Sequence, residues 1–220
     1  CFPNGSCQVQ AMLGAVHAAC YDISAACSGF LFALNTAHAF ISAGMYKTVL
    51  VIGADVLSKL VDWTDRGICV LFGDGAGAVV VKADEQGILG FNMHSNGVKG
   101  PVLTCAARTG GNFLTGKRPE LGYMTMDGQE VFKFAVKKVP ECISQVLEDT
   151  GISKEEIDQF IIHQANYRII ESIAKRLGVE QERFPVNMGL YGNTSAASIP
   201  ILLDEQNRSG ALKKGSKLVL

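Results

Sequence analysis

The apolar residues between positions 27 and 41 recur three and four positions apart, a spacing that predicts an amphipathic helix. We expect this helix to begin at Cys27 and to end at Gly44, because glycine often terminates helices. The continuous β-branched run 48–53 follows it and is typical of a strand buried on both faces of a sheet. The same criteria predict further helices over 7–16, 131–147, 166–177 and 193–207, and further strands over 19–24, 69–72, 78–81, 88–93, 160–163 and from 217 onward.

Strands alternate with helices along most of the chain, which indicates an α/β architecture with parallel strand pairs. A weak internal echo favours two related halves. A helix that begins at Cys27 leads to a strand at 47–51, and a helix that begins at Asn193 leads to a strand at 217–220. Chance similarity explains this echo equally well. The Gly-rich segment 73–77 precedes strand-like residues, which argues against a dinucleotide-binding loop and indicates a tight turn.

Composition and charge exclude several classes of protein. Hydrophobic residues make up 48% and charged residues 19% of the 220 positions, which excludes a disordered chain. The net charge of −1 favours neither nucleic acid nor a membrane surface as the partner. Residues 23–46 lack charges, but their hydroxyl, amide and glycine positions predict a helix buried in protein rather than in lipid. The seven cysteines lack metal-site spacing, so we expect free thiols in a reducing cytoplasm and no metal.

Cys27 lies where a predicted strand passes into a helix. The first N–H groups of a helix lack partners and its dipole is positive there, so a thiolate would be stabilised and its pKa lowered. The same N–H groups can hold the oxyanion of a tetrahedral intermediate. A buried, unreactive cysteine is equally consistent with this segment alone.

His163 and Asn193 also lie at the ends of predicted elements. His163 follows an apolar run and precedes a helix, where α/β folds usually place their chemistry. Taken alone, His163 is a structural histidine and Asn193 a helix N-cap. Together with Cys27 they form a nucleophile accompanied by two hydrogen-bond donors.

Three motifs lie in register along the chain: DISAACSGF at 22–30, IHQAN at 162–166 and GNTSAAS at 192–198. Together with TDRG at 64–67, FGDGAG at 72–77 and DGQEVF at 127–132, they give the chain a resemblance to β-ketoacyl-ACP synthase III, a condensing enzyme with the thiolase fold. The resemblance runs over essentially the whole chain and implies duplicated strand–helix halves in a layered α-β-α-β-α architecture. It divides the chain into an N-terminal half at 1–85 and a C-terminal half at 86–220.

The resemblance implies an acyltransferase that initiates type II fatty acid synthesis. It would condense an acyl-CoA primer, which we expect to be acetyl-CoA, with malonyl-ACP to give 3-ketoacyl-ACP. Cys27 would take the acyl group, while His163 and Asn193 would promote decarboxylation and stabilise the enolate. A neutral histidine and an amide can each donate to a thioester oxygen that becomes negative. Two half-reactions that share one cysteine predict ping-pong kinetics, with coenzyme A thioester as substrate and no cofactor.

The resemblance also assigns binding residues around this set. Arg66 and Asn166 match positions that contact coenzyme A, and Arg168 matches a basic position facing the acyl carrier protein. The alternative for Arg66 is a surface ion pair with Asp62 or Asp65, and for Arg168 a solvated helix face.

The acyl pocket and the assembly are implied in the same way. Met126 and Phe132 match pocket or tunnel positions, although each could equally be a core residue. Phe2 matches a residue that crosses a dimer interface and closes the partner's acyl pocket. The resemblance therefore implies a homodimer.

Both ends of the sequence depart from the family's pattern. The chain begins without Met and stops at 217–220, which reads as a strand just beginning. A family tryptophan that stacks on adenine, and a Gly-rich segment that supplies an oxyanion-hole amide, have no counterpart here. We therefore expect a fragment that lacks both termini and is incomplete as a catalyst.

Three other functions compete with this interpretation. Another thiolase-superfamily enzyme is the nearest, but a thiolase would carry a second cysteine where this chain has Asn193. Hydroxymethylglutaryl-CoA synthases belong to the same superfamily, and starter synthases of secondary metabolism share the Cys–His–Asn set. A papain-like hydrolase would place His163 and Asn193 after Cys27 in the same order, but its local signature is absent. A non-catalytic acyl-binding relative would leave Cys27 inert.

Overall fold

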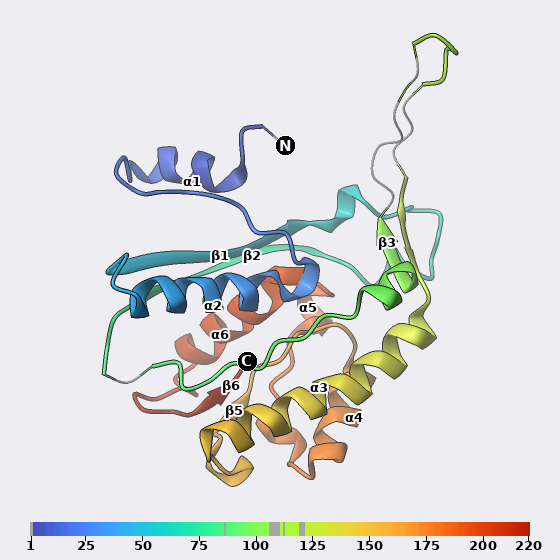
Figure 1. The fold of residues 1–220 in the computed structure, drawn as a ribbon. Coiled ribbons are helices and arrows are strands. Elements are labelled where there is room, and N and C mark those ends of the chain that lie inside the picture. Colours follow the sequence, from blue (N-terminus) through green and yellow to red (C-terminus); the bar gives the residue numbers. More distant parts are fainter. Residues whose placement is uncertain (1, 86, 106–110, 112, 119–121) are drawn as a thin grey trace.

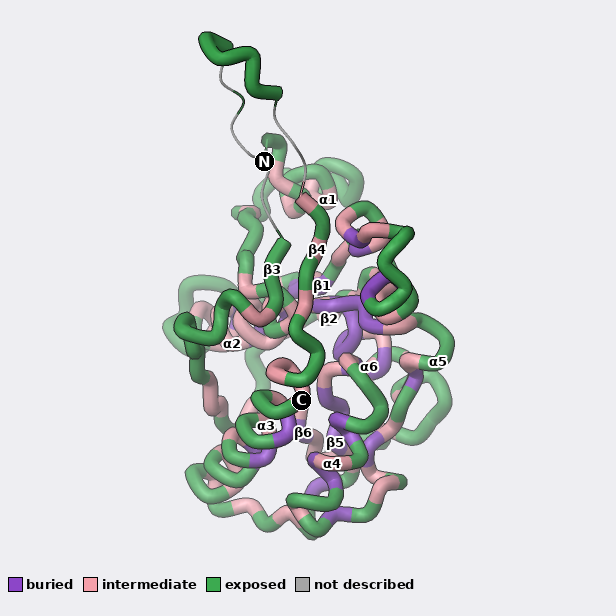
Figure 2. The backbone as a smooth tube through the Cα atoms, turned by 90° about the vertical axis from the view of Figure 1, so that its right-hand side faces the viewer, coloured by how far each residue is buried: buried purple, intermediate pink, exposed green. Residues whose placement is uncertain are grey.

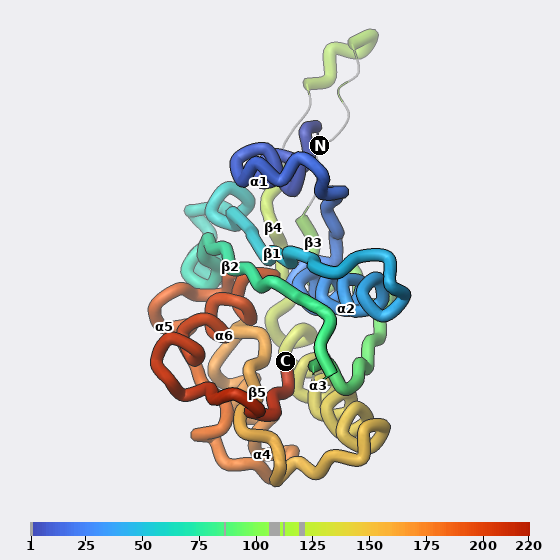
Figure 3. The backbone as a smooth tube through the Cα atoms, turned by 90° about the vertical axis from the view of Figure 1, so that its left-hand side faces the viewer, coloured from blue at the N-terminus to red at the C-terminus, as the bar shows by residue number. Residues whose placement is uncertain are grey.

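The computed structural model describes every residue except 1, 86, 106–110, 112 and 119–121. The elements stack in layers, which Figure 1 and Figure 3 show from two sides. This arrangement confirms the expected α-β-α-β-α architecture. In order, the layers are α1 (Gly5–Leu13), the pair β1 (Thr48–Val56) and β2 (Asp74–Lys82), the helices α2 (Gly29–Ser42) and α6 (Ser198–Arg208), the pair β5 (Gln159–Phe160) and β6 (Leu218–Val219), and the helices α3 (Gly128–Thr150) and α4 (Tyr167–Leu177).

Shorter elements connect the layers. Two strands pair antiparallel at the base of the extension seen in Figure 1. The 3-10 turns η1 and η6 come immediately before α2 and α6, and they are the connections that matter for the site. The short elements are β3 (Leu103–Cys105), β4 (Met124–Met126), α5 (Met188–Tyr191), η1 (Ala26–Ser28), η2 (Leu57–Lys59), η3 (Gly97–Val102), η4 (Lys154–Glu156), η5 (Gln181–Arg183) and η6 (Ser195–Ala197).

Two apolar clusters hold the layers together. One joins β1 and β2 to α2 and α6, and the other joins α3 and α4 to β5 and β6. Figure 2 therefore shows the buried residues along the inner layers, whereas α1 has no buried residue. Ile161 lies in the first cluster and its neighbours Phe160 and Ile162 in the second, so the segment before His163 is anchored from both sides.

Glycines let the η6 segment approach β1 and β2 closely. A Cβ at Gly53 would lie 2.1 Å from the carbonyl oxygen of Ala196, and one at Gly73 would lie 2.0 Å from that of Tyr191. The Gly-rich segment 73–77 is therefore not the tight turn that the sequence indicated. Residues 74–77 form the start of β2, where Gly77 leaves room for the backbone of α6.

Several predicted helices are confirmed, together with their caps. The Asp127 carboxylate accepts from the N–H groups of Gln129 and Glu130 and so caps α3, and Asn166 caps α4. The helix predicted over 193–207 begins later, as η6 followed by α6, because residue 195 has a left-handed backbone.

The predicted strand at 19–24 is wrong, since this segment pairs with no strand among the described residues. Its carboxylate has another role. Asp22 accepts from the N–H groups of Gly5 (2.8 Å) and Ser6 (2.9 Å), which satisfies the first turn of α1. These hydrogen bonds lower the pKa of Asp22.

The predicted strands at 69–72 and 88–93 are also wrong. The first is a turn in which the N–H groups of Ile68 and Cys69 donate to Asp65, and only Phe72 forms a β-bridge. The second runs extended beside α2, where the Asn35 amide donates to the Met93 sulfur at 3.2 Å. Side-chain packing, not strand pairing, fixes this second segment.

Among the paired strands of the described residues, the predicted parallel pairing is correct for one pair. β5 and β6 are parallel, as strands joined through intervening helices should be. β1 and β2 are antiparallel along their whole length. The helix layer covers one face of this pair, while side chains such as Leu50 and Val80 remain exposed on the strands.

Candidate active site

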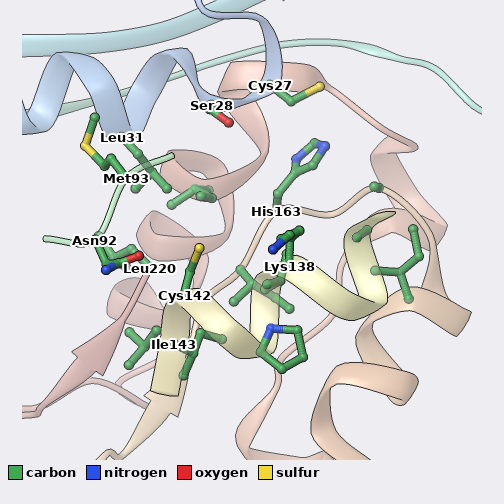
Figure 4. Close-up of a pocket in the computed structure, with 18 of the residues that line it drawn as sticks. Cys27, Ser28, Leu31, Asn92, Met93, Lys138, Cys142, Ile143, His163 and Leu220 are labelled. Atoms are coloured by element: carbon green, nitrogen blue, oxygen red, sulfur yellow. The ribbon is translucent and has the colours of Figure 1, made fainter. Parts of the chain in front are cut away.

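Cys27 sits in the η1 turn, directly before α2. The residue before it, Ala26, has a φ of 47°, a left-handed conformation that few non-glycine residues adopt. This backbone bends sharply from the extended segment into the helix. Cys27 lines a groove, with His163 below it in Figure 4.

The Cys27 thiol has a raised pKa, and this corrects the expectation of a lowered one. Burial is the largest cause, and the charge of Asp55 acts in the same direction. A hydrogen bond with the Ser195 side chain opposes both. The loss of water around the thiolate thus raises the pKa by more than the N–H groups at the helix start lower it. The resting cysteine is a protonated thiol at neutral pH.

His163 follows β5 and precedes α4, at the position that the sequence predicted. Its ring faces the groove, and Nδ1 lies 2.6 Å from Oγ of Ser198. Burial of the imidazole lowers its pKa to about 4, although one side of the residue is still accessible. The imidazole is therefore neutral at pH 7 and offers one N–H and one unprotonated nitrogen.

Asn193 is buried, with 8% of its surface exposed, and its orientation is fixed. Its backbone N–H donates to Leu71 at 2.8 Å, and its carbonyl accepts from Gly73 at 3.0 Å. The side-chain oxygen accepts from the N–H of Ser195 at 2.9 Å. The amide nitrogen has no partner among the described residues, so it can donate to a ligand.

One groove brings most of the predicted site residues together. The groove is lined by the predicted residues Cys27, Met126, Phe132, His163, Asn166, Arg168 and Asn193, but not by Phe2 or Arg66.

Neither a metal-binding cluster nor a membrane-spanning helix occurs among the described residues. They contain no group of three His, Cys, Asp or Glu side chains that could hold a metal ion. None of their helices has the length and apolar character needed to span a membrane.

The residues predicted to contact coenzyme A and the carrier protein are all exposed, and two of the three line this groove. Arg66 is exposed between two groove residues and forms no ion pair within the described part of the chain, so the proposed pairs with Asp62 and Asp65 are not formed. Asn166 is exposed, and its side chain caps α4 by accepting from the N–H of Arg168 at 2.9 Å. Arg168 itself is exposed at the start of α4.

The predicted acyl-pocket residues serve partly as core. Phe132 packs against the α3–α4 cluster, and Met126 packs against a small cluster around Val61 and Ile68. Both side chains also line the groove. Phe2 is fully exposed and lies outside it.

Sequence reasoning missed three residues that hold the site together. Ser198 contacts His163, Ser195 contacts Cys27, and Asp55 accepts from the N–H of Ala196 at 3.2 Å. Both serines belong to the GNTSAAS motif, which signalled their position but not their partners. Asp55 lies two residues beyond the predicted strand 48–53, and no sequence pattern pointed to it.

The layered fold and the groove with cysteine, histidine and asparagine are typical of thiolase-fold condensing enzymes. The family model described as 3-oxoacyl-[acyl-carrier-protein (ACP)] synthase III matches residues 21–97, and its C-terminal counterpart matches residues 147–220. β-Ketoacyl-[acyl-carrier-protein] synthase III of Clostridium acetobutylicum is 50% identical, with 99% of this chain and 68% of that protein aligned. The chain belongs to the β-ketoacyl-[acyl-carrier-protein] synthase III family.

Two solved structures place this family in context. 3-Oxoacyl-[acyl-carrier-protein] synthase III from Aquifex aeolicus superimposes with a TM-score of 0.89 at 46% identity, covering 99% of this chain and 67% of that one. The priming β-ketosynthase of the R1128 polyketide pathway superimposes with a TM-score of 0.81 at 32% identity, covering 94% and 62%. The fold is thus shared with an enzyme of secondary metabolism.

Proposed function

We propose that this protein condenses an acyl-CoA primer with malonyl-ACP, releasing carbon dioxide and forming the 3-ketoacyl-ACP that initiates type II fatty acid synthesis. The convergence of Cys27, His163 and Asn193 on one groove carries the proposal. Membership of the family supports it. A starter synthase of secondary metabolism is the second candidate, favoured by the R1128 enzyme but less similar in sequence than the fatty-acid relatives.

In the first half-reaction, the Cys27 sulfur attacks the thioester carbon of acyl-CoA. A new C–S bond forms, coenzyme A leaves as a thiolate, and the proton lost by Cys27 neutralises it. The raised thiol pKa means that only a small fraction of Cys27 is the reactive thiolate at neutral pH, so loss of the proton precedes the attack. We assign the outer contacts with coenzyme A to Arg66 and Asn166.

In the second half-reaction, the bond between the malonyl carboxylate and its neighbouring carbon breaks. Carbon dioxide leaves, and the electron pair of this bond remains on the malonyl group as an enolate. The Asn193 amide and one N–H of neutral His163 donate to the thioester oxygen as it becomes negative. The enolate carbon attacks the acyl carbon, and the Cys27 sulfur leaves and regains a proton. The low histidine pKa suits this role, since a donor and not a strong base is needed.

The remaining assignments concern the surroundings of the site. We assign Arg168 to the docking of acyl carrier protein, because it is exposed beside the groove. Met126 and Phe132 would limit the acyl chain. The exposed Phe2 would close the partner's pocket in a homodimer, and the enzyme would act in the cytoplasm. The division into halves at 1–85 and 86–220 stays a prediction.

The first test is the intact mass of the purified protein after mixing with acetyl-CoA, followed by peptide mapping. One acetyl group on Cys27 would support initiation of fatty acid synthesis. An adduct only with longer or branched acyl-CoA would keep the mechanism and change the primer. No adduct with any thioester would overturn the proposal and favour a non-catalytic acyl-binding protein.

A further inference from the structure

Ser198 lies at the first position of α6 and reaches His163 across the layers. Its hydroxyl oxygen is 2.6 Å from Nδ1 of the imidazole, a short distance for this type of hydrogen bond. The residue is 2% exposed, so solvent does not compete for the hydroxyl. The two residues are 35 positions apart, and only the fold brings them together.

A backbone donor already occupies the same hydroxyl oxygen. The N–H of Gln164 donates to Oγ of Ser198 at 3.3 Å. The position of Gln164 is fixed by its own buried side chain. The side-chain amide nitrogen donates to the carbonyl oxygens of Ile162 at 2.9 Å and Pro185 at 3.4 Å. The side-chain oxygen of Gln164 accepts from the N–H of Asn187 at 3.2 Å.

The hydroxyl proton therefore has one available acceptor. With the N–H of Gln164 on the oxygen, the O–H of Ser198 points to Nδ1 of His163; no other acceptor for it is found among the described residues. If Nδ1 carried the ring proton, this buried O–H would be left unsatisfied, which is costly. The arrangement selects the tautomer with the proton on Nε2.

We propose that Ser198 is a positioning residue that holds His163 in the Nε2–H tautomer and aims that N–H into the groove. The proposal rests on the function proposed above, because it explains how His163 comes to donate to the malonyl thioester. A free imidazole would divide its proton between both nitrogens and rotate.

The geometry predicts which half-reaction depends on Ser198. Transfer of the acyl group to Cys27 does not use the His163 donor, whereas stabilisation of the enolate does. Removal of one oxyanion donor costs about a hundredfold to a thousandfold in rate. Loss of the residue that only orients the donor should cost less, and we expect about tenfold to a hundredfold in condensation.

The test compares Ser198→Ala with Ser198→Thr and Ser209→Ala in the intact protein. Ser198→Thr keeps a hydroxyl. Ser209→Ala removes one from the other end of α6, where it donates only to Gln206. Rapid-mix mass spectrometry follows acylation by acetyl-CoA, and condensation is then measured from the acyl-enzyme. ¹⁵N-histidine NMR reports the His163 tautomer, with the signal assigned by His163→Ala.

We expect the wild-type protein to show a protonated Nε2 and an unprotonated Nδ1. Ser198→Ala should show a mixture of tautomers and slower condensation, with acylation within about twofold. Ser198→Thr should restore both, and Ser209→Ala should change neither. A wild-type signal with Nδ1 protonated, or unchanged condensation in a folded Ser198→Ala protein, would overturn the proposal. A wild-type protein without acylation would instead reject the proposed function, and the NMR result would still judge the tautomer.

Discussion

Two helix junctions meet beside the groove, and they share a backbone form while differing in chemistry. Each opens with a non-glycine residue in the left-handed region, Ala26 at a φ of 47° and Ser195 at 52°. In each, a 3-10 turn then leads into a helix, α2 after the first and α6 after the second. The turns contact each other, and Gly29 lies next to the side chain of Ala196.

The difference lies in how tightly the side chains are held. At the second junction Asn193, Ser195 and Ser198 are almost fully buried, and hydrogen bonds fix the side-chain oxygens of Asn193 and Ser198. At the first junction Cys27 is only partly buried, and its side-chain partner is the Ser195 hydroxyl. A group that gains and loses an acyl chain needs this freedom. Groups that stabilise charge work best when they are fixed in advance.

The largest expected effect is the loss of the first junction's thiol. Cys27→Ala should abolish acylation by acetyl-CoA and overall condensation, because it removes the sulfur that we propose forms the acyl-enzyme. Intact-mass spectrometry measures the first and product formation the second. Cys142→Ala is the matched control, since this cysteine lines the same groove but lies on α3. Full acylation of the Cys27→Ala protein would show that the nucleophile is elsewhere.

Substitutions of His163 and Asn193 should slow one half-reaction and leave the other almost unchanged. In His163→Ala and Asn193→Ala, acylation of Cys27 should remain within a few-fold of wild type, while condensation falls by about a hundredfold to a thousandfold. Single-turnover kinetics from the isolated acyl-enzyme measure this directly. Equal loss of both steps in these two proteins, with folding unchanged, would remove the proposed division of work.

The two half-reactions should also differ in their response to pH. Because the Cys27 pKa is raised from 9.0, the thiolate fraction grows as pH increases, and acylation should rise about tenfold per pH unit up to at least pH 9. In the acyl-enzyme the sulfur no longer titrates. Condensation then depends on neutral His163, whose pKa of about 4 keeps it neutral across pH 5.5 to 8.

Pre-steady-state rates measured from pH 5.5 to pH 9.5 distinguish these profiles. Acylation that reaches a plateau near neutral pH would mean that the Cys27 pKa is lowered, because the N–H groups at the helix start stabilise the thiolate more than burial destabilises it. An acid limb of condensation near pH 6.5 would mean that the His163 ring is better solvated than its burial suggests.

Local patterns were enough to predict the elements that carry the site. The spacing of apolar residues predicted α2, and it also predicted α3 and α4 over 131–147 and 166–177, although α3 begins three residues earlier, at Gly128. The same patterns failed at 19–24, where the carboxylate of Asp22 satisfies a helix start 16 residues away instead of leaving a strand. Propensity describes one segment at a time, and this contact depends on another segment.

The site shows the same division between local and distant information. Cys27, His163 and Asn193 stand at element ends that the sequence reveals. The partner of His163 is not revealed in this way, because Ser198 lies 35 residues away along the chain. The raised thiol pKa was missed for this reason: local sequence shows the helix start but not the burial that outweighs it.

The smallest expected effect tests the backbone form that the two junctions share. At a φ of 47°, Ala26 has a conformation that costs an L-residue roughly 1 kcal/mol and glycine almost nothing. Ala26→Gly should therefore raise the free energy of unfolding by about 0.5 kcal/mol. Ala25→Gly is the matched control, because Ala25 has a φ of −144°, where glycine only adds entropy to the unfolded chain. It should lower the free energy of unfolding by about 0.5 kcal/mol. Urea denaturation of both proteins measures the difference, and equal effects at the two positions would mean that the bend before Cys27 is not strained.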